Sequence, residues 1–504
     1  MTRWRGLILG AVLGLAVQAA QAETFTLRGV TFSDSIYLTE SQLQDAVAPY
    51  LDRPITFEDV QKMLADVDRL YVLSGIVTAR AVLLPQEVPD GIVKLDLIEA
   101  EIGAVQVEPL GGTRADFIRR NLSVAEGEKP DYEALERDLR IFELAHDFVP
   151  QLTFGPGETT GTVNAVIGGN VPERFTWTGS LDNFGTEETG ETRATIAGRW
   201  ANVSGLRDTL SFQLQGSEGS YSGAFGYSRP VGGWQGGRMT ATLSYTNSNV
   251  IRADFAALDI VSDTVQASVG YRVPFRVQPD RHFMFDISLV AEETTSTLGD
   301  VPFQTTTLVE IVPQLSWSRK WDRQSLSLSA GLKIGTSDTL ETSETEGSYT
   351  LLFGSANYAR RVGETMGFEA SAIVQLAPDQ NLPVPRLISA GGISTMRGYP
   401  NNIRSGDSGV ILHTQISRLV PWDLGERVRV TPFAFADGAL VVPYRTDGSI
   451  DTDQDLLLSV GAGARFDMGD DLSGLLMVGV PLRETLGFDD QGSGRIYAGL
   501  DYRF

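Results

Sequence analysis

The feature of this sequence that most constrains its fold is an alternation of apolar and polar residues, which runs from position 174 to position 504. In the segment 209–215, for example, Leu210, Phe212 and Leu214 share one parity, and the intervening residues are Ser or Gln. Successive side chains of a β-strand point to opposite faces, so one face of such a strand suits lipid and the other suits water. Since the same stretch contains no apolar run long enough to cross a bilayer as a helix, the pattern predicts a transmembrane β-barrel. A soluble β-sandwich, whose half-buried strands also alternate, is the alternative.

The length of this region gives the size of the predicted barrel. A tilted membrane-spanning strand takes about ten residues. About sixteen strands would leave nearly equal lengths for turns and loops, whereas about eight would leave implausibly long loops. We therefore expect an all-β barrel of about sixteen antiparallel strands at residues 174–504.

The two ends of the chain favour a protein of the bacterial outer membrane. Arg3 and Arg5 precede the apolar run 6–17, and the small residues of 20–22 offer a cleavage site, so residues 1–22 are predicted to be a secretory signal peptide. At the other end, an apolar strip of alternate residues finishes with Tyr502 and Phe504. This strip resembles the C-terminal assembly signal of outer-membrane proteins, which implies the barrel-assembly machinery and outer-membrane lipid as partners.

Composition excludes several classes of site. The chain has no Cys, which rules out disulfides and thiolate metal sites. Its net charge of -23 argues against nucleic acid as a partner, because binding to phosphates needs basic patches. The three histidines, His146, His282 and His413, are scattered, so we expect no metal site and no cofactor.

Two short motifs could suggest an enzyme. Residues 406–409 read Gly-Asp-Ser-Gly, as around a serine-protease nucleophile, but that chemistry needs a histidine base within reach. His146 lies in the N-terminal region and His413 shares the parity of polar residues on a predicted lumenal face. Residues 155–161 are rich in Gly but lack the Lys-Ser/Thr of a phosphate loop. We therefore predict no catalytic residues and no enzymatic activity.

Residues 23–173 have a different pattern, which contains one small α/β unit twice. In the first copy, residues 23–100, the strand 25–32 precedes a helix that opens with a capping box at Thr39 and a second helix that starts at Thr56. Gly75 ends the second helix, and strands at 76–84 and 92–99 follow. The second copy, residues 101–173, repeats the order β-α-α-β-β. The region is therefore predicted to be α+β, with two domains before the barrel.

This domain order, with Leu84-Pro85-Gln86 and Asp90-Gly91 between the last two strands, resembles the polypeptide-transport-associated (POTRA) domains. Three further motifs of the barrel resemble the two-partner secretion transporters, the ShlB/FhaC/HecB-type haemolysin secretion/activation proteins of the outer-membrane insertase/transporter superfamily. The motifs are Leu181-Asp182-Asn183-Phe184-Gly185, then Met396-Arg397-Gly398-Tyr399 with the segment 405–409, and Phe433-Ala434-Phe435-Ala436-Asp437-Gly438.

The resemblance implies that Arg397 lies on a long loop folded back into the barrel. Strand parity independently places Phe435 and Asp437 on the lumenal face, and a guanidinium can bind a carboxylate in a bidentate way. We expect Arg397 to bind Asp437, Gly398 to permit a tight turn, and Tyr399 to pack against the inner wall. The predicted site thus consists of a lumenal loop motif and a lumenal strand motif. Its residues are Met396, Arg397, Gly398, Tyr399, Phe435, Asp437 and Gly438. The alternative for residues 397–400 is an ordinary exposed turn.

The function implied by the resemblance is secretion of an unfolded partner exoprotein, an adhesin or haemolysin with an N-terminal secretion domain, through the barrel. The POTRA domains in the periplasm would recognise it, and β-augmentation at a sheet edge is a suitable mode. An insertase for outer-membrane proteins is the alternative, although insertases usually carry more periplasmic repeats. A passive porin would not need the N-terminal region. Because Phe25 begins a strand just after the predicted cleavage site, we expect no plug helix before the first domain.

Overall fold

The computed structural model describes residues 24–231, 236–340, 347–378, 380–419, 422–423, 428–485 and 493–504. The predicted signal peptide, residues 1–22, lies outside these described residues. The chain forms two compact units. The first comprises Met1–Gln106, Val124–Tyr132 and Thr153–Val166, and the second comprises Val107–Ser123, Glu133–Leu152 and Ile167–Phe504.

The first unit begins with an α/β domain that has the predicted order of helices and strands, except that the strand predicted at 25–32 is divided into two strands and an additional short strand lies between the two helices. A three-stranded sheet has the strand order β2-β5-β4, and β1 pairs with β3. The elements are β1 (Phe25–Leu27), β2 (Gly29–Phe32), α1 (Glu40–Val47), η1 (Ala48–Tyr50), β3 (Arg53–Ile55), α2 (Phe57–Leu73), β4 (Ala79–Val82), η2 (Pro89–Gly91) and β5 (Ile92–Glu99). A capping box at Thr39 opens the first helix, as the sequence predicts, and the second helix starts at Thr56 with a capping box that was not predicted from the sequence.

The apolar stripe of α2 forms much of the core of this domain. Val60, Met63, Val67 and Tyr71 are all buried, which follows from their helical spacing. The strand predicted from residue 76 starts only at Ala79. Its first residues instead close the helix, since the backbone N–H of Ile76 donates to the carbonyl of Tyr71 (2.9 Å).

The segment 101–168 has the predicted order β-α-α-β-β and, among its described residues, no counterpart of β1 and β3. Its strands form a sheet in the order β6-β8-β7. The elements are β6 (Glu101–Val107), α3 (Ala115–Arg120), α4 (Tyr132–Ala145), β7 (Gln151–Pro156) and β8 (Thr162–Gly168). The two compact units divide this segment, so most of its sheet belongs to the first and its helices mainly to the second. No helix among the described residues is long and apolar enough to cross a membrane.

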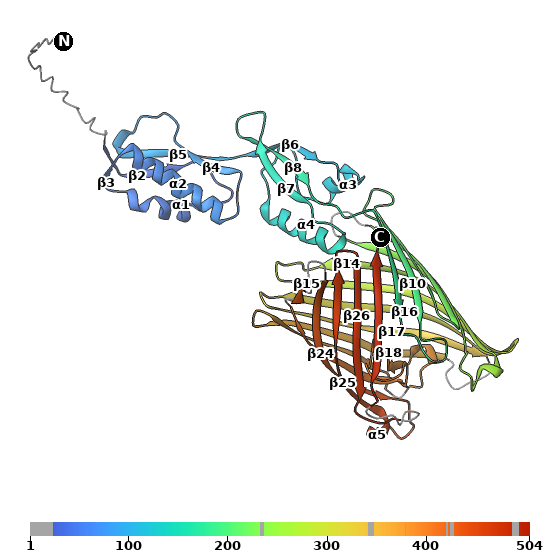
Figure 1. The fold of residues 1–504 in the computed structure, drawn as a ribbon. Coiled ribbons are helices and arrows are strands. Elements are labelled where there is room, and N and C mark those ends of the chain that lie inside the picture. The colour runs from blue at the N-terminus through green and yellow to red at the C-terminus, as the bar shows by residue number, and fades with distance from the viewer. Residues whose placement is uncertain are drawn as a thin grey trace, which may run out of the picture. The chain divides into compact units, whose positions relative to one another are not determined.

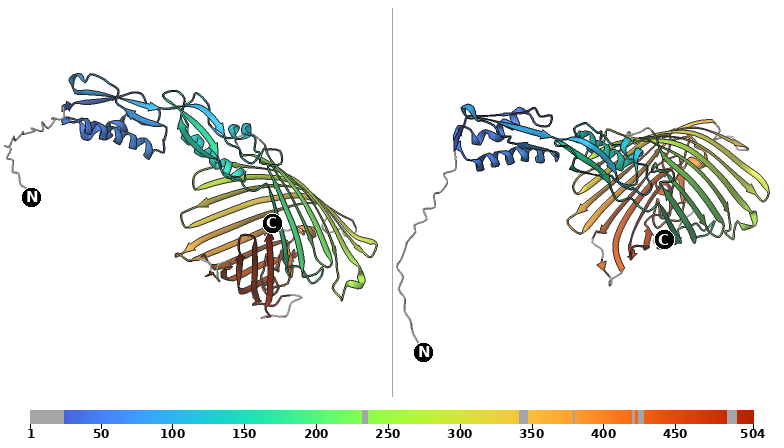
Figure 2. Two further views of the ribbon diagram at one scale, coloured as in Figure 1. Left: turned by 45° about the horizontal axis from the view of Figure 1, so that its top comes forward. Right: turned by 90° about the horizontal axis from the view of Figure 1, so that it is seen from above.

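The rest of the second unit is the predicted closed antiparallel barrel, with sixteen strands in the described part of the chain (Figures 1 and 2). The two-residue β23 (Trp422–Asp423) adds to the end of β24. The sixteen strands are β9 (Phe175–Asp182), β10 (Arg193–Ala201), β11 (Thr209–Gly216), β12 (Ser220–Pro230), β13 (Arg238–Asn249), β14 (Ile260–Phe275), β15 (Arg281–Leu298), β16 (Val301–Lys320), β17 (Gln324–Leu340), β18 (Gly347–Val362), β19 (Met366–Leu376), β22 (Ser408–Arg418), β24 (Val428–Val442), β25 (Leu456–Met468), β26 (Leu472–Pro481) and β27 (Arg495–Arg503).

The outer face of the barrel is apolar, as the alternation predicts. Leu289, Leu328 and Ile334 are among its exposed large side chains. A soluble β-sandwich would bury these residues between its sheets, so that alternative is excluded.

The barrel closes where its first strand meets its last. The register there covers only Thr178–Asp182 opposite Gly499–Arg503 and is shorter than that between any other neighbours among the sixteen strands described. Asn183 extends this contact beyond the end of β9. Its side chain accepts a hydrogen bond from the backbone of Ala498 (2.8 Å) and donates one to the carbonyl of Ile496 (2.9 Å). The motif 181–185 therefore helps to close the cylinder.

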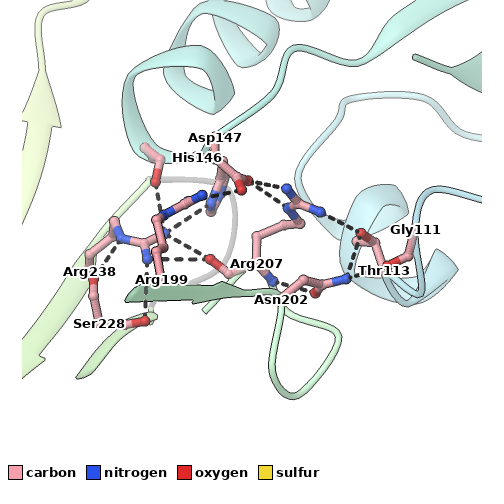
Figure 3. A network of polar contacts seen from close by, with 10 residues as sticks. Gly111, Thr113, His146, Asp147, Arg199, Asn202, Arg207, Ser228 and Arg238 are labelled. Atoms are coloured by element: carbon pink, nitrogen blue, oxygen red, sulfur yellow. Dashed lines mark hydrogen bonds and ion pairs between the residues drawn. The ribbon is translucent and has the colours of Figure 1, made fainter. Parts of the chain in front are cut away.

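Within the second unit, the residues after α4 are bound to the end of the barrel by a polar network (Figure 3). Arg199 of β10 and Arg207 of the following turn both bind the carboxylate of Asp147, at 3.1 and 2.7 Å. The guanidinium of Arg207 is almost fully buried and lies over the ring of Phe148. One carboxylate thus holds two arginines.

A second part of the network starts from β13. Arg238 donates to the carbonyl of Ala145 (2.8 Å) and lies 3.2 Å from Nδ1 of His146. Burial, and then the positive charge of Arg238, lower the pKa of His146 to about 3. His146 is therefore neutral near pH 7. These contacts join residues 145–148 to the first barrel strands.

Candidate functional site

The chain between β19 and β22 folds against the inner face of the barrel and contains the predicted site. This inner loop, residues 377–407 without Asp379, which is not described, includes η6 (Val384–Arg386), β20 (Ile388–Ala390) and β21 (Arg404–Gly406). β20 and β21 pair as a short hairpin. Gly391 and Gly392 follow β20 with φ of +130° and +80°, so the chain can turn sharply there.

Arg397 is held by three groups of the barrel wall. Its Nε and Nη2 donate to the two carboxylate oxygens of Asp437, each at 2.7 Å, and its Nη1 donates to Oε1 of Gln415 at 3.0 Å. The guanidinium lies 3.7 Å from the ring centre of Phe435, close enough for a cation–π interaction. Arg397 is 9% exposed and Asp437 is 4% exposed. The predicted bidentate contact is therefore present, and it is buried.

The register of the wall brings two further side chains to Asp437. His413 of β22 lies directly opposite Asp437 of β24, and its Nδ1 is 3.4 Å from the carboxylate. Gln415, two residues further along β22, lies on the same face. Strand parity placed His413 and the other polar residues of its strand on one lumenal face, without indicating a role for them. The role of His413 and Gln415 follows from the cross-strand register, which places these two residues beside Asp437 and which the sequence of a single strand does not reveal.

The neighbours of Arg397 fix the loop by shape. Gly398 has φ +103°, and an added Cβ would lie 2.9 Å from the backbone carbon of Gly479, so a side chain does not fit there. Met396 and Tyr399 are fully buried against the barrel wall. The hydroxyl of Tyr399 lies 2.8 Å from the carbonyl oxygen of Arg483. The loop motif is thus packed as well as ion-paired.

The other predicted site residues lie in different surroundings. Phe435 is buried beneath Arg397, whereas Gly438 follows Asp437 and so points to the opposite face of β24, where an added Cβ would meet Leu458. Tyr502 and Phe504 are exposed on the outer face of the last strand, with ring centres 5.6 Å apart. Their part in assembly stays a prediction.

The segment 406–409, which resembles a protease motif, fixes the base of the inner loop. The carboxylate of Asp407 accepts the backbone N–H groups of Leu382 and Tyr444, both at 2.6 Å. The hydroxyl of Ser408 accepts the backbone N–H of Ala377 (2.9 Å). The side chains of Asp407 and Ser408 therefore both fix the position of backbone segments by accepting their N–H groups. The sequence alone does not indicate this role of Asp407, because its partners lie far apart in the chain.

The contact between Arg397 and Asp437 can form and separate without disturbing the barrel. A guanidinium and a carboxylate can separate without breaking any hydrogen bond between barrel strands, because both act through side chains. The contact joins a loop of the lumen to the wall, so its separation would remove this link while the cylinder stays intact.

Comparison with known proteins gives the same picture. The model of the family described as haemolysin secretion/activation protein ShlB/FhaC/HecB matches residues 166–466. The model of the ShlB-type POTRA domain matches residues 25–100. The family match covers more than half of the chain and includes all of the predicted loop and strand motifs.

Individual relatives are distant but align over most of their length. The outer membrane transporter CdiB of Dickeya dadantii is 23% identical over 456 residues, which cover 86% of this chain and 79% of that protein. The heme/hemopexin transporter protein HuxB of Haemophilus influenzae is 22% identical over 425 residues, which cover 80% and 74%. The solved structure of CdiB from Escherichia coli has the same fold, with a TM-score of 0.71 at 18% identity over 98% of this chain and 93% of that one.

Proposed function

Because the chain belongs to the haemolysin secretion/activation family, whose members are outer-membrane transporters of partner exoproteins, we propose that it carries an unfolded exoprotein through its barrel and that the inner loop is the movable closure. The observation that carries the proposal is the buried contact between Arg397 and Asp437, which joins this loop to the wall. Separation of the pair would open the lumen for an extended chain.

The periplasmic region would bind the exoprotein before it enters the barrel. In the first domain, β2 and β4 are the edge strands, and within the described sheet each pairs with β5 alone. An extended segment can add to such an edge through main-chain hydrogen bonds, which place few demands on its sequence. This mode suits an unfolded substrate with an N-terminal secretion domain. We also infer that residues 101–173 act as a second POTRA domain and that residues 1–22 are removed on export.

The driving force would come from the substrate. The sequence has no phosphate-binding motif, so the exoprotein, by folding outside the cell, would prevent its own return. The activity needs no bond-making chemistry, and the chain would act as a channel rather than an enzyme. The barrel-assembly machinery would insert it into the membrane by way of the strand that ends at Phe504.

Secretion of the cognate exoprotein tests the proposal. Arg397→Ala removes all three polar contacts of this side chain with the wall, and Arg397→Lys keeps the charge but not the planar fork. We expect both variants to assemble as barrels and to secrete much less exoprotein, because the loop can no longer return to a defined closed position.

Arg429→Ala is the matched control, since Arg429 lies on the same strand and the same face as Asp437 but is exposed. It should secrete normally. Normal secretion by Arg397→Ala in cells that contain assembled barrel would refute the role assigned to the pair. Normal secretion in cells that lack the transporter would refute the proposed function as a whole, and loss of other outer-membrane proteins from those cells would favour the insertase alternative.

A further inference from the structure

A second buried arginine binds the inner loop to a different part of the wall. Arg386, in η6, is 7% exposed. Its Nη1 donates to Oε2 of Glu292 on β15 (3.0 Å), and its Nε lies 2.8 Å from Oε1 of Glu310 on β16. Both carboxylates are also buried. In the order of strands around the barrel, β15 and β16 are separated from β24, which carries Asp437, by β17, β18, β19 and β22.

The two carboxylates are themselves held in place. The hydroxyl of Tyr349 on β18 donates to Glu310 (2.9 Å), and the amide of Gln266 on β14 donates to Glu292 (2.8 Å). Gln375 at the end of β19 donates to the carbonyl of Arg386 (2.8 Å). Side chains from five strands therefore surround Arg386. Such support fixes the position of a guanidinium more closely than a single ion pair does.

The neighbours of Arg386 belong to the same fixed part of the loop. Leu382 is buried in a cluster with Leu308, Tyr349 and Leu351 of the wall. Its backbone N–H donates to Asp407 at the other end of the loop. We call residues 382–390 and 403–407 the stem. It is held by Arg386, by Asp407 and by the pairing of β20 with β21.

Residues 391–402, which lie between the two parts of the stem, form the tip, which contains Arg397. Backbone conformations that allow sharp turns lie at both of its ends. Gly391 and Gly392 have φ of +130° and +80°, and Asn402 has φ of +53°. These are the positions where rotation of a few dihedral angles could move the tip without moving the stem.

We propose that Arg386 is a positioning residue for transport: it fixes the stem on β15 and β16, so that opening moves only the tip, about Gly391–Gly392 and Asn402. The proposal rests on the proposed function, because it specifies which part of the closure moves. Removal of Arg386 leaves two buried carboxylates with Lys333 as the nearby cation, and it should release the stem. Release of Arg397 alone should leave the stem in place.

The absence of cysteine from the sequence makes a direct test simple. Single cysteines at two buried positions report the two parts: Met396→Cys, 0% exposed, for the tip and Leu382→Cys, 2% exposed, for the stem. The measurement is the rate at which a membrane-impermeant maleimide labels each cysteine in the purified full-length barrel. It needs no exoprotein, so its result is independent of the secretion assay.

In the background of Arg397→Ala, labelling of Met396→Cys should rise about tenfold or more, while labelling of Leu382→Cys stays unchanged. In the background of Arg386→Ala, labelling of Leu382→Cys should rise by a similar factor, and Arg386→Lys should restore part of the protection. A shift in electrophoretic mobility on heating shows that each variant is a folded barrel. Should Arg386→Ala not fold, Glu310→Gln keeps the shape of the site, removes one charge and should give a smaller rise at Leu382→Cys.

Three results would overturn the proposal. Labelling of both cysteines in Arg397→Ala would mean that the loop leaves the wall as one body. Labelling of neither would mean that the tip does not move separately. An unchanged rate at Leu382→Cys in folded Arg386→Ala, or in Glu310→Gln where that variant replaces it, would mean that Arg386 does not hold the stem.

Discussion

The replacement Asp437→Asn should shift the transporter toward its open state, because it removes one charge and hardly changes the shape of the side chain. In the closed state Arg397 would stay buried without its counter-ion. Breaking a buried ion pair costs about 3–5 kcal/mol. The contact with Phe435 at 3.7 Å and the hydrogen bond to Gln415 would remain, so we take the lower end of this range.

A loss of about 3 kcal/mol from the closed state raises the ratio of open to closed channels about a hundredfold. Single-channel recording in planar bilayers measures this ratio directly, and no exoprotein is needed. Asp467→Asn is the matched control, because Asp467 lies on the neighbouring strand β25 with the parity of the lumenal face and is only partly buried. Its open time should equal that of the unmodified protein.

A double-mutant cycle tests the reasoning further. Arg397→Ala and Asp437→Ala should each raise the open time, and the double variant should resemble the single variants, because either change alone removes the same contact. Equal open times for the unmodified protein and all three variants would refute the view that this pair closes the channel. Strictly additive effects would show that the two residues act separately.

Two further predictions concern the loop and the network at the end of the barrel. Gly398→Ala should raise the open time of the channel, because the added Cβ would lie 2.9 Å from the backbone of Gly479. Gly363→Ala is the control, since Gly363 also has a positive φ (+65°) but has open space around it, and it should not change the open time. Equal single-channel records for both variants would contradict the steric argument. In the folded protein the pKa of His146 is lowered to about 3, whereas in the unfolded protein it is about 6.5. Because only the unfolded form takes up a proton between these values, the free energy of unfolding should fall as the pH drops from about 6.5 to 3. The loss should be about 2 kcal/mol at pH 5. Thermal release of residues 133–152, measured by limited proteolysis between pH 8 and pH 5, should lose this part of its pH dependence in His146→Asn; an unchanged dependence would contradict the buried, neutral state.

The barrel could be predicted from the sequence because its strands repeat one simple pattern. Alternation fixes the face of each side chain, so Asp437 could be placed on the lumenal wall from its own strand. The partner Arg397 could not be found in that way. It lies in a loop without periodicity, and only the resemblance to a family placed it inside the barrel.

Arg386 shows most clearly which contacts cannot be predicted from the sequence. Glu292 and Glu310 have the parity of the inner face, so their position was readable from the alternation. Nothing in the sequence 383–387, Pro-Val-Pro-Arg-Leu, shows that its arginine reaches them, because the path of a loop depends on packing and not on a repeat.

The segment 101–173 shows a related limit of sequence-based prediction. The order of its elements was readable from caps and periodicity. Its division between the two compact units was not, because Asp147 and Ala145 bind arginines that follow them by more than fifty residues in the chain. Local pattern carries no information about such partners.

The short register between β9 and β27 also bears on how the barrel is made. Every other pairing in the described cylinder joins neighbouring barrel strands along the chain, which are separated by a turn or loop, by the inner loop between β19 and β22, or by the short β23 between β22 and β24. The last pairing alone must bring together residues near position 180 and residues near position 500, and it carries the large entropic cost of a long-range contact. The ribbon of strands therefore has two unpaired edges until β27 meets β9. A partner protein that covers those edges would keep them from pairing with other chains before the cylinder closes.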